Sequence, residues 1–140
     1  SYQLKTSGPL LDRFDLCVEM GPVPAAILQG PPTSPTDEEV RARLAKAWNL
    51  QNSRKQRGGF GPSSTGSLES ILNLGATPRA RRELTRLSER FSLSGRGNLR
   101  LLRVARTLAD LDGMETLEET HLKRAALFRV SLPSEEEARV

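Results

Sequence analysis

The chain has 140 residues, of which 36% are hydrophobic, 27% are charged and only 4% are aromatic. This length suits a single modest core, and apolar residues drawn mainly from Leu, Val, Ile and Ala favour helices packed on helices over a β-sandwich. The net charge of +4 comes almost wholly from arginine, which suits phosphate, but so small an excess is weak evidence for such a partner.

Cys17 is the single cysteine, which excludes an internal disulfide and favours a reducing compartment. No apolar run approaches the ~20 residues that cross a bilayer, and no secretory signal is visible. Because Ser1 opens in the middle of a pattern, we interpret the chain as a fragment. We expect a cytoplasmic protein without a membrane partner.

Residues 14–20 alternate apolar and polar side chains, which predicts a strand. No convincing partner strand follows, so we expect the rest of that sheet to precede Ser1 and residues 1–24 to be the poorly packed remnant of another domain. Residues 21–36 hold five prolines and two glycines, and we assign 25–36 to a linker.

A helix is predicted to begin after Thr36, because Thr36 and Glu39 match a capping box. Val40, Leu44 and Trp48 recur every four residues and are predicted to be its buried face. The helix should fade near Arg54, and the glycine-rich residues 57–67 are predicted to be a flexible loop.

A short helical turn is predicted over 68–74, ending at Gly75, and Thr77 followed by Pro78 predicts the start of the next helix. Its inner stripe is expected to be Ala80, Leu84, Leu87 and Phe91. Another face carries Arg79, Arg82, Arg86 and Arg90. That face is either solvated, which we prefer because Glu83 and Glu89 dilute the charge, or a track for a phosphate backbone.

The next helix is predicted over 97–111, with one apolar face. That face is expected to hold Leu101, Val104, Ala105, Leu108 and Leu111. Arg100, Arg103 and Arg106 lie opposite and are interpreted as a solvated face, with a weak surface pair between Arg106 and Asp110. Arg96 differs, because it lies at the mouth of the helix, where free backbone N–H groups and a guanidinium together suit a phosphate.

A last helix is predicted to start at Thr116, with Glu119 completing a second capping box, and to reach about Arg129. His121 is the only histidine and is interpreted as a helix-surface residue, since one histidine and a distant cysteine do not make a metal site. The predicted fold is all-α: a small helical bundle over 37–130, preceded by an orphan β-strand and the proline-rich linker and followed by a disordered tail, 131–140.

Two stretches carry a family resemblance: S-G-P-L-L-D-R-F-D-L-C-V-E-M at 7–20 and L-S-G-R-G-N-L-R-L-L-R-V-A-R-T-L-A-D-L-D-G at 93–113. Together they resemble the closing part of magnesium-chelatase-related AAA+ ATPases, especially the competence-protein ComM/YifB-like branch. The resemblance covers nearly the whole chain but is specific only over these two blocks. It implies that 1–24 is a remnant of the ATPase core and that the helices form the C-terminal lid.

The resemblance implies a role for two arginines. Arg13, in the L-L-D-R-F-D block, is similar to an arginine finger that reaches the γ-phosphate bound by the neighbouring subunit; from the residues alone it would instead pair with Asp12 or Asp15. Arg96 is similar to a sensor-2 arginine that contacts ATP in its own subunit; from the residues alone it would be an exposed helix-start arginine.

No G-x-x-x-x-G-K-[ST] phosphate loop occurs in the chain. We therefore expect ATP and Mg²⁺ to be cofactors of an intact parent and expect no hydrolysis by these residues alone. The resemblance implies as partners the parent's own ATPase core, neighbouring subunits of a ring such as a hexamer, and DNA as the substrate of branch migration or helicase-like remodelling; metal chelation is the other motor substrate. The alternative function is a stand-alone arginine-rich helical module that binds nucleic acid or an acidic partner.

Overall fold

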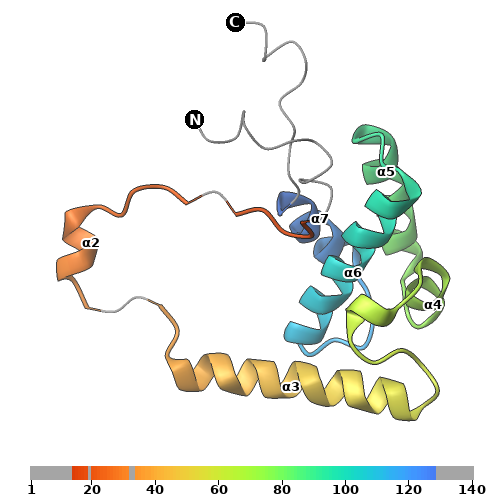
Figure 1. Cartoon of the computed structure of the whole chain (residues 1–140), viewed down its shortest axis with the longest axis horizontal. Coiled ribbons are helices and arrows are strands. Elements are labelled where there is room, and N and C mark those ends of the chain that lie inside the picture. The colour runs from red at the N-terminus through yellow and green to blue at the C-terminus, as the bar shows by residue number, and fades with distance from the viewer. Residues whose placement is uncertain (1–13, 19, 32–33, 129–140) are drawn as a thin grey trace, which may run out of the picture.

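The computed structural model describes residues 14–18, 20–31 and 34–128 (Figure 1). The regular elements in this part of the chain are helices, so the predicted all-α bundle is confirmed. They are α2 (Ala25–Gln29), α3 (Asp37–Gln56), the 3₁₀ turn η2 (Ser63–Thr65), α4 (Leu68–Asn73), α5 (Pro78–Arg90), α6 (Gly95–Leu111) and α7 (Glu119–Leu127).

Helix α6 is the centre of the bundle. It contacts α3, α4, α5, α7 and η2, and α3 crosses beneath its C-terminal end (Figure 1). The core side chains are aliphatic and come from α4 to α7 and the loop before α7. They are Ile71, Ala80, Leu84, Leu87, Leu101, Leu102, Ala105, Ala109, Leu117, Leu122 and Ala125. The predicted stripes of α5 and α6 supply five of these eleven side chains, namely Ala80, Leu84, Leu87, Leu101 and Ala105.

Side-chain caps set the starts of four helices. In α3 the predicted capping box is present, with the Glu39 N–H donating to Thr36 Oγ1 at 3.3 Å and the Thr36 N–H donating to Glu39 Oε2 at 2.7 Å. Ser67, Thr77 and Ser94 cap α4, α5 and α6 in the same way through their hydroxyl oxygens. Each of these contacts is local in sequence, and the sequence pattern predicts those at Thr36 and Thr77.

The predicted strand over 14–20 is not formed by its described residues, 14–18 and 20. A single strand leaves its ladder groups unpaired, and within the described part of the chain no second strand is present to pair them. The segment has only isolated contacts with the bundle instead. The linker prediction also changes slightly, because α2 forms one short, fully exposed helix within it.

The predicted buried face of α3 is wrong. Val40, Leu44 and Trp48 are 40%, 55% and 58% exposed, whereas Ala47 and Arg54 are buried. Periodicity identifies an apolar face of a helix, but it does not show whether another helix packs against that face. Helix α3 packs against α6 through a different face, so the predicted row stays at the surface.

Residues 57–66, part of the loop predicted over 57–67, form a strap over the end of α3 and contain the 3₁₀ turn η2. The Arg54 guanidinium lies 4.8 Å from the centre of the Phe60 ring. A Cβ on Gly59 would lie 3.0 Å from Arg54 Cγ, and one on Gly66 would lie 2.7 Å from Ile71 Cγ1. Gly59 and Gly66 therefore allow close packing of the strap.

The ion pair of Arg106 and Asp110 is buried, so its prediction as a surface pair is wrong. Their exposures are 2% and 0%. Asp110 accepts hydrogen bonds from Arg54 of α3 and from Arg106 Nε, the latter at 3.1 Å, and Gln51 adds a third donor at 3.2 Å. Burial lowers the pKa of Arg106, while Asp110 opposes that change. Asp110 thereby fastens α3 to α6.

The remaining donors of the two arginines hold the adjoining loops. Arg54 donates to the carbonyl of Gly61 in the strap at 3.4 Å, and Arg106 donates to the carbonyl of Glu115 at 2.8 Å and to that of Met114. Buried guanidinium groups need such partners because each unsatisfied donor carries a desolvation cost.

Helix α7 begins later than predicted and buries its histidine. Its N-cap is Glu118, and His121 is 4% exposed, so the prediction of a surface histidine is wrong. His121 Nδ1 accepts a hydrogen bond from the Glu118 N–H at 2.9 Å, and Nε2 lies 3.5 Å from Asp112 Oδ2. A histidine that can serve as a cap acceptor explains why the helix starts here.

The first prediction concerns Asp110. Asp110→Asn removes the charge that two buried guanidiniums share, and we expect the free energy of unfolding to fall by about 3–5 kcal/mol in urea titrations. Glu119→Gln, which breaks an exposed pair with Lys123, is the control and should change stability little. A loss for Asp110→Asn as small as that of the control would contradict this account of the α3–α6 junction.

The second prediction concerns pH. Burial, reinforced by Arg106 and Arg124, lowers the pKa of His121, although Asp112 and Glu118 oppose the shift. As the pH falls, the imidazole of His121 is therefore protonated in the unfolded chain before it is protonated in the folded chain. The contribution of the neutral His121 to stability is complete above about pH 6.5 and is lost below it. The urea midpoint should therefore fall between pH 7.5 and 5.5, and His121→Gln should flatten that fall. An identical slope in both proteins would exclude His121 as the cause.

Candidate functional site

Of the two predicted site residues, Arg96 lies within the described structure and Arg13 lies outside it. Arg96 is the second residue of α6 and is exposed. Its side chain forms no hydrogen bond or ion pair with any described residue. Helix α6 starts two residues earlier than predicted, which places Arg96 in the first turn.

The first turn of α6 is suited to an anion. Ser94 Oγ accepts from the Gly97 N–H at 3.1 Å, and the Asn98 N–H donates to the Ser94 carbonyl at 2.9 Å. The N–H groups of Gly95 and Arg96 have no acceptor among the described residues, and the turn contains no acidic side chain. A Cβ on Gly95 would meet nothing within 4 Å, so the approach is open. The backbone N–H donors, the helix dipole and the guanidinium of Arg96 all favour an anion at this position.

The turn before α6 is held by side chains that the sequence analysis did not single out. The Asn98 amide donates to Ser88 Oγ at 2.9 Å and to the Leu93 carbonyl at 3.3 Å, and the Leu93 N–H donates to the Ser88 carbonyl at 2.9 Å. Ser92 adopts a φ of 47°, which is uncommon for a residue with a side chain. The end of α5 thus fixes where α6 begins.

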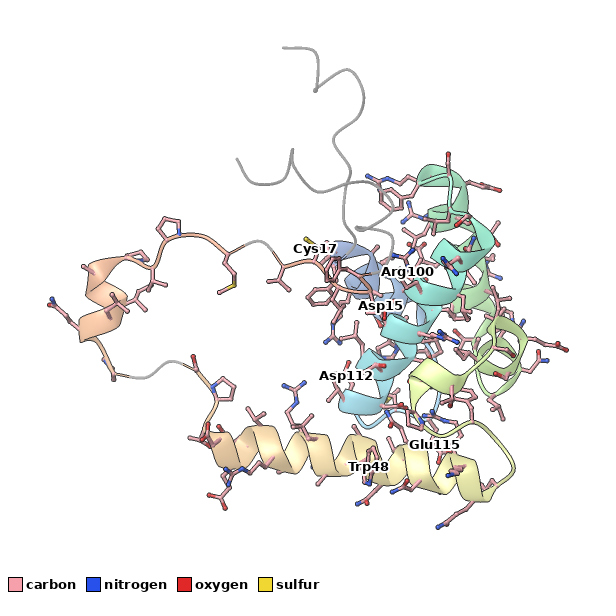
Figure 2. All side chains as sticks on the ribbon, in the orientation of Figure 1. Asp15, Cys17, Trp48, Arg100, Asp112 and Glu115 are labelled. Atoms are coloured by element: carbon pink, nitrogen blue, oxygen red, sulfur yellow. The ribbon has the colours of Figure 1, made fainter. Side chains whose placement is uncertain are left out.

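Arg100 lies one helical turn after Arg96 and reaches the N-terminal segment. Its Nη1 donates to the carbonyl of Phe14 at 3.0 Å, and its Nε lies 3.9 Å from Asp15 Oδ1. Cys17 adds a second contact, since its N–H donates to the Phe128 carbonyl at the end of α7 at 2.8 Å. Figure 2 shows Asp15, Cys17 and Arg100 gathered beside α6 and α7. Phe14 directly follows Arg13 in the sequence.

The other α6 arginines have different partners, so the prediction of a solvated face over Arg100, Arg103 and Arg106 is wrong. Arg103 Nε donates to the Gly66 carbonyl in the strap at 3.1 Å, and Arg106 belongs to the buried network. Among the four arginines of this helix, only Arg96 is exposed.

The four arginines of the predicted stripe on α5 are exposed, as predicted. They are Arg79, Arg82, Arg86 and Arg90. Arg86 donates to both oxygens of Glu83, at 2.8 Å and 2.6 Å, and this pair lowers the pKa of Glu83. Arg90 lies over the Phe91 ring, 5.3 Å from its centre. Glu83 thus offsets part of the charge of the stripe.

A pocket of about 370 Å³ lies near the C-terminal end of α6, away from Arg96. Glu115, which follows that helix, lines the pocket. Its lining is Leu50, Arg54, Arg57, Asn73, Leu74 and Glu115. Arg57 and Glu115 pair across it at 3.0 Å, so its charges are already matched. Within the described residues, no group of three or more His, Cys, Asp or Glu side chains could hold a metal ion. None of the described helices is long and apolar enough to span a membrane.

Comparison with known proteins gives the family. Residues 34–129 match the family described as "Magnesium chelatase, subunit ChlI C-terminal". The chain is 31% identical over 129 residues to the competence protein ComM of Haemophilus influenzae and 30% identical over the same length to the uncharacterized protein YifB of Escherichia coli. Each alignment covers 91% of this chain but only 25% of the relative.

The matched region contains α3 to α7 and the residues around Arg96, and the chain spans about a quarter of the length of these relatives. The chain therefore belongs to the family of the C-terminal domain of the magnesium chelatase subunit ChlI.

Proposed function

We propose that this chain is the helical lid of a magnesium-chelatase-related AAA+ ATPase and that Arg96 senses the phosphates of ATP bound in its own subunit. The observation that supports this most is the first turn of α6, where an exposed guanidinium and two open backbone N–H groups coincide without any acidic neighbour. These donors fit an anion and give it a definite direction of approach.

In this proposal the lid senses bound ATP, but the rest of the complete protein forms the ATP-binding site. The chain has no phosphate loop, so the ATP and Mg²⁺ are held by the core of the complete protein. Arg96 contributes a charged hydrogen bond that exists only while its phosphate partner is present, and its loss on hydrolysis changes the angle of the lid, a hinge motion. Arg13 acts on the site of the neighbouring subunit in a cytoplasmic ring, such as a hexamer.

We extend the proposal to the substrate of the motor, which we propose to be DNA, remodelled by branch migration or helicase-like action. Support comes from the relative that is named a competence protein and from the exposed arginines of α5. In a ring, one such surface per subunit would sum to a larger positive field than a single chain has.

The third prediction tests the sensor. In the complete protein, Arg96→Ala should lower kcat for ATP hydrolysis by about 10²–10³-fold, the usual loss when a donor to a developing charge is removed. Arg41→Ala, which removes an exposed arginine from α3, is the matched control and should leave kcat unchanged. Unaltered turnover in Arg96→Ala, with the circular dichroism spectrum preserved, would refute the sensor role.

The fourth prediction separates the motor from the alternative of a stand-alone nucleic-acid-binding module. The exposed arginines Arg79, Arg82 and Arg90 are the observation that favours the alternative. For a lid, we expect the 140-residue chain to bind DNA only weakly, with log Kobs falling by less than about 3 per unit of log salt. Tight binding with a slope of several units, abolished by Arg79→Ala and Arg82→Ala together, would establish the module instead.

A further inference from the structure

Two hydrogen bonds hold the segment 14–18 against the bundle. One runs from Arg100 on α6 to the Phe14 carbonyl at 3.0 Å, and the other runs from the Cys17 N–H to the Phe128 carbonyl at 2.8 Å. Beyond this segment, residues 20–31 are exposed along their whole length. The position of the segment therefore depends on α6 and α7 and not on the linker that follows it.

We infer that Arg100 is a positioning residue that makes the segment following Arg13 move together with α6, so that phosphate sensing in one subunit sets the arginine finger offered to the next. The coupling rests on the proposed function, whereas the docking of the segment by Arg100 does not. No covalent step is involved.

The geometry of α6 supports this coupling. Arg96 and Arg100 are one turn apart on the same face, separated by about 6 Å along the axis. The helix between and beyond them is rigid, since Leu101, Leu102 and Ala105 are buried in the core. A displacement of α6 that follows the contact of Arg96 with a phosphate would therefore also carry Arg100, which holds the Phe14 carbonyl one turn away.

The chemistry of Arg100 suits the task. Its side chain is 20% exposed, so its hydrogen bond to the Phe14 carbonyl is partly shielded from water, and its Nε simultaneously faces the carboxylate of Asp15. A guanidinium can address two acceptors at fixed angles, whereas the ammonium of a lysine is a point charge. Arg100 thus defines both the position and the direction of the segment.

The first experiment measures docking in the 140-residue chain. Cys17 is its only cysteine and is half-buried, so the rate of alkylation by N-ethylmaleimide reports release of the segment. Arg100→Ala should raise that rate by up to about tenfold, because a hydrogen bond to a charged donor is lost. Arg100→Lys should give an intermediate rate, and Arg41→Ala should give the rate of the unaltered chain.

Urea unfolding of Arg100→Ala distinguishes release of the segment from unfolding of the bundle. If only the segment is released, the urea midpoint stays close to that of the unaltered chain. An unchanged alkylation rate in a folded Arg100→Ala protein overturns the inference. A rate for Arg41→Ala as high as that of Arg100→Ala also overturns it, since release of the segment would then not be specific to Arg100.

The second experiment assigns the coupling in the complete protein by mixing inactive variants. Arg100→Ala should lower kcat with little change in KM, because its effect falls on the finger and not on nucleotide binding. Mixed rings of Arg100→Ala and Arg96→Ala should regain little turnover, because no subunit then holds both arginines. Recovery at about a quarter of the interfaces would show that Arg100 positions the finger without sensing by Arg96 and would overturn the coupling. Mixed rings of Arg100→Ala and Arg13→Ala should regain none.

Recovery against Arg13→Ala overturns the inference by placing Arg100 on the sensor side. If neither Arg96→Ala nor Arg13→Ala lowers turnover, the proposed function fails and the coupling fails with it, while the alkylation rates still decide whether Arg100 docks the segment. The two failures are thus distinguishable.

Discussion

The carboxylate of Asp110 is the interaction on which the arrangement of the bundle depends. It has no exposed surface, yet Arg54 from α3 and Arg106 from α6 both bind it. Two guanidiniums around one carboxylate leave an excess of positive charge in the interior, and the carbonyls of Gly61, Met114 and Glu115 accept the remaining donors. Each buried guanidinium N–H must keep its acceptor. The position of the strap, the position of the α6–α7 loop and the angle between α3 and α6 therefore depend on one another. Aliphatic packing alone would tolerate other angles, since it has no direction.

The arginines of α6 show how one residue type takes four roles within eleven residues. Arg96 is exposed, Arg100 contacts the N-terminal segment, Arg103 contacts the strap, and Arg106 lies in the core. Their spacing places them on one side of the helix, and a sequence alone therefore presents them as one surface. What distinguishes them is the identity of the groups opposite, which come from residues 14, 66 and 110. The partner of Arg100 is a backbone carbonyl 86 residues earlier in the chain, a contact that leaves no trace in a side-chain pattern.

The sequence predicts what depends on neighbouring residues and misses what depends on distant ones. The caps at Thr36 and Thr77, and the core stripe of α5, follow from contacts within about one turn and agree with the structure. The exposure of Trp48, the burial of His121 and the fitted strap at 57–66 depend on where other helices end, so periodicity could not supply them. At the candidate site, the position of Arg96 at a helix start is predictable from S-G-R-G, whereas the role of Ser88 and Asn98 in fixing that start is not.

The two ends of α6 differ in a way that bears on motion. The C-terminal end is fastened to α3 through Asp110 and to α7 through Asp112, which pairs with Arg124 and faces His121. The N-terminal end has no buried ion pair of this kind: Ser94 and Asn98 make neutral contacts, and Arg100 donates a charged hydrogen bond to the Phe14 carbonyl. A helix of 17 residues is about 25 Å long, so a small rotation about the fastened end moves the other end by several ångströms. In the proposed function, Arg96 meets a phosphate at the end of α6 that lies away from the Asp110 junction. In the coupling that we infer, this asymmetry is what would convert the loss of one charged contact into displacement of the segment 14–18.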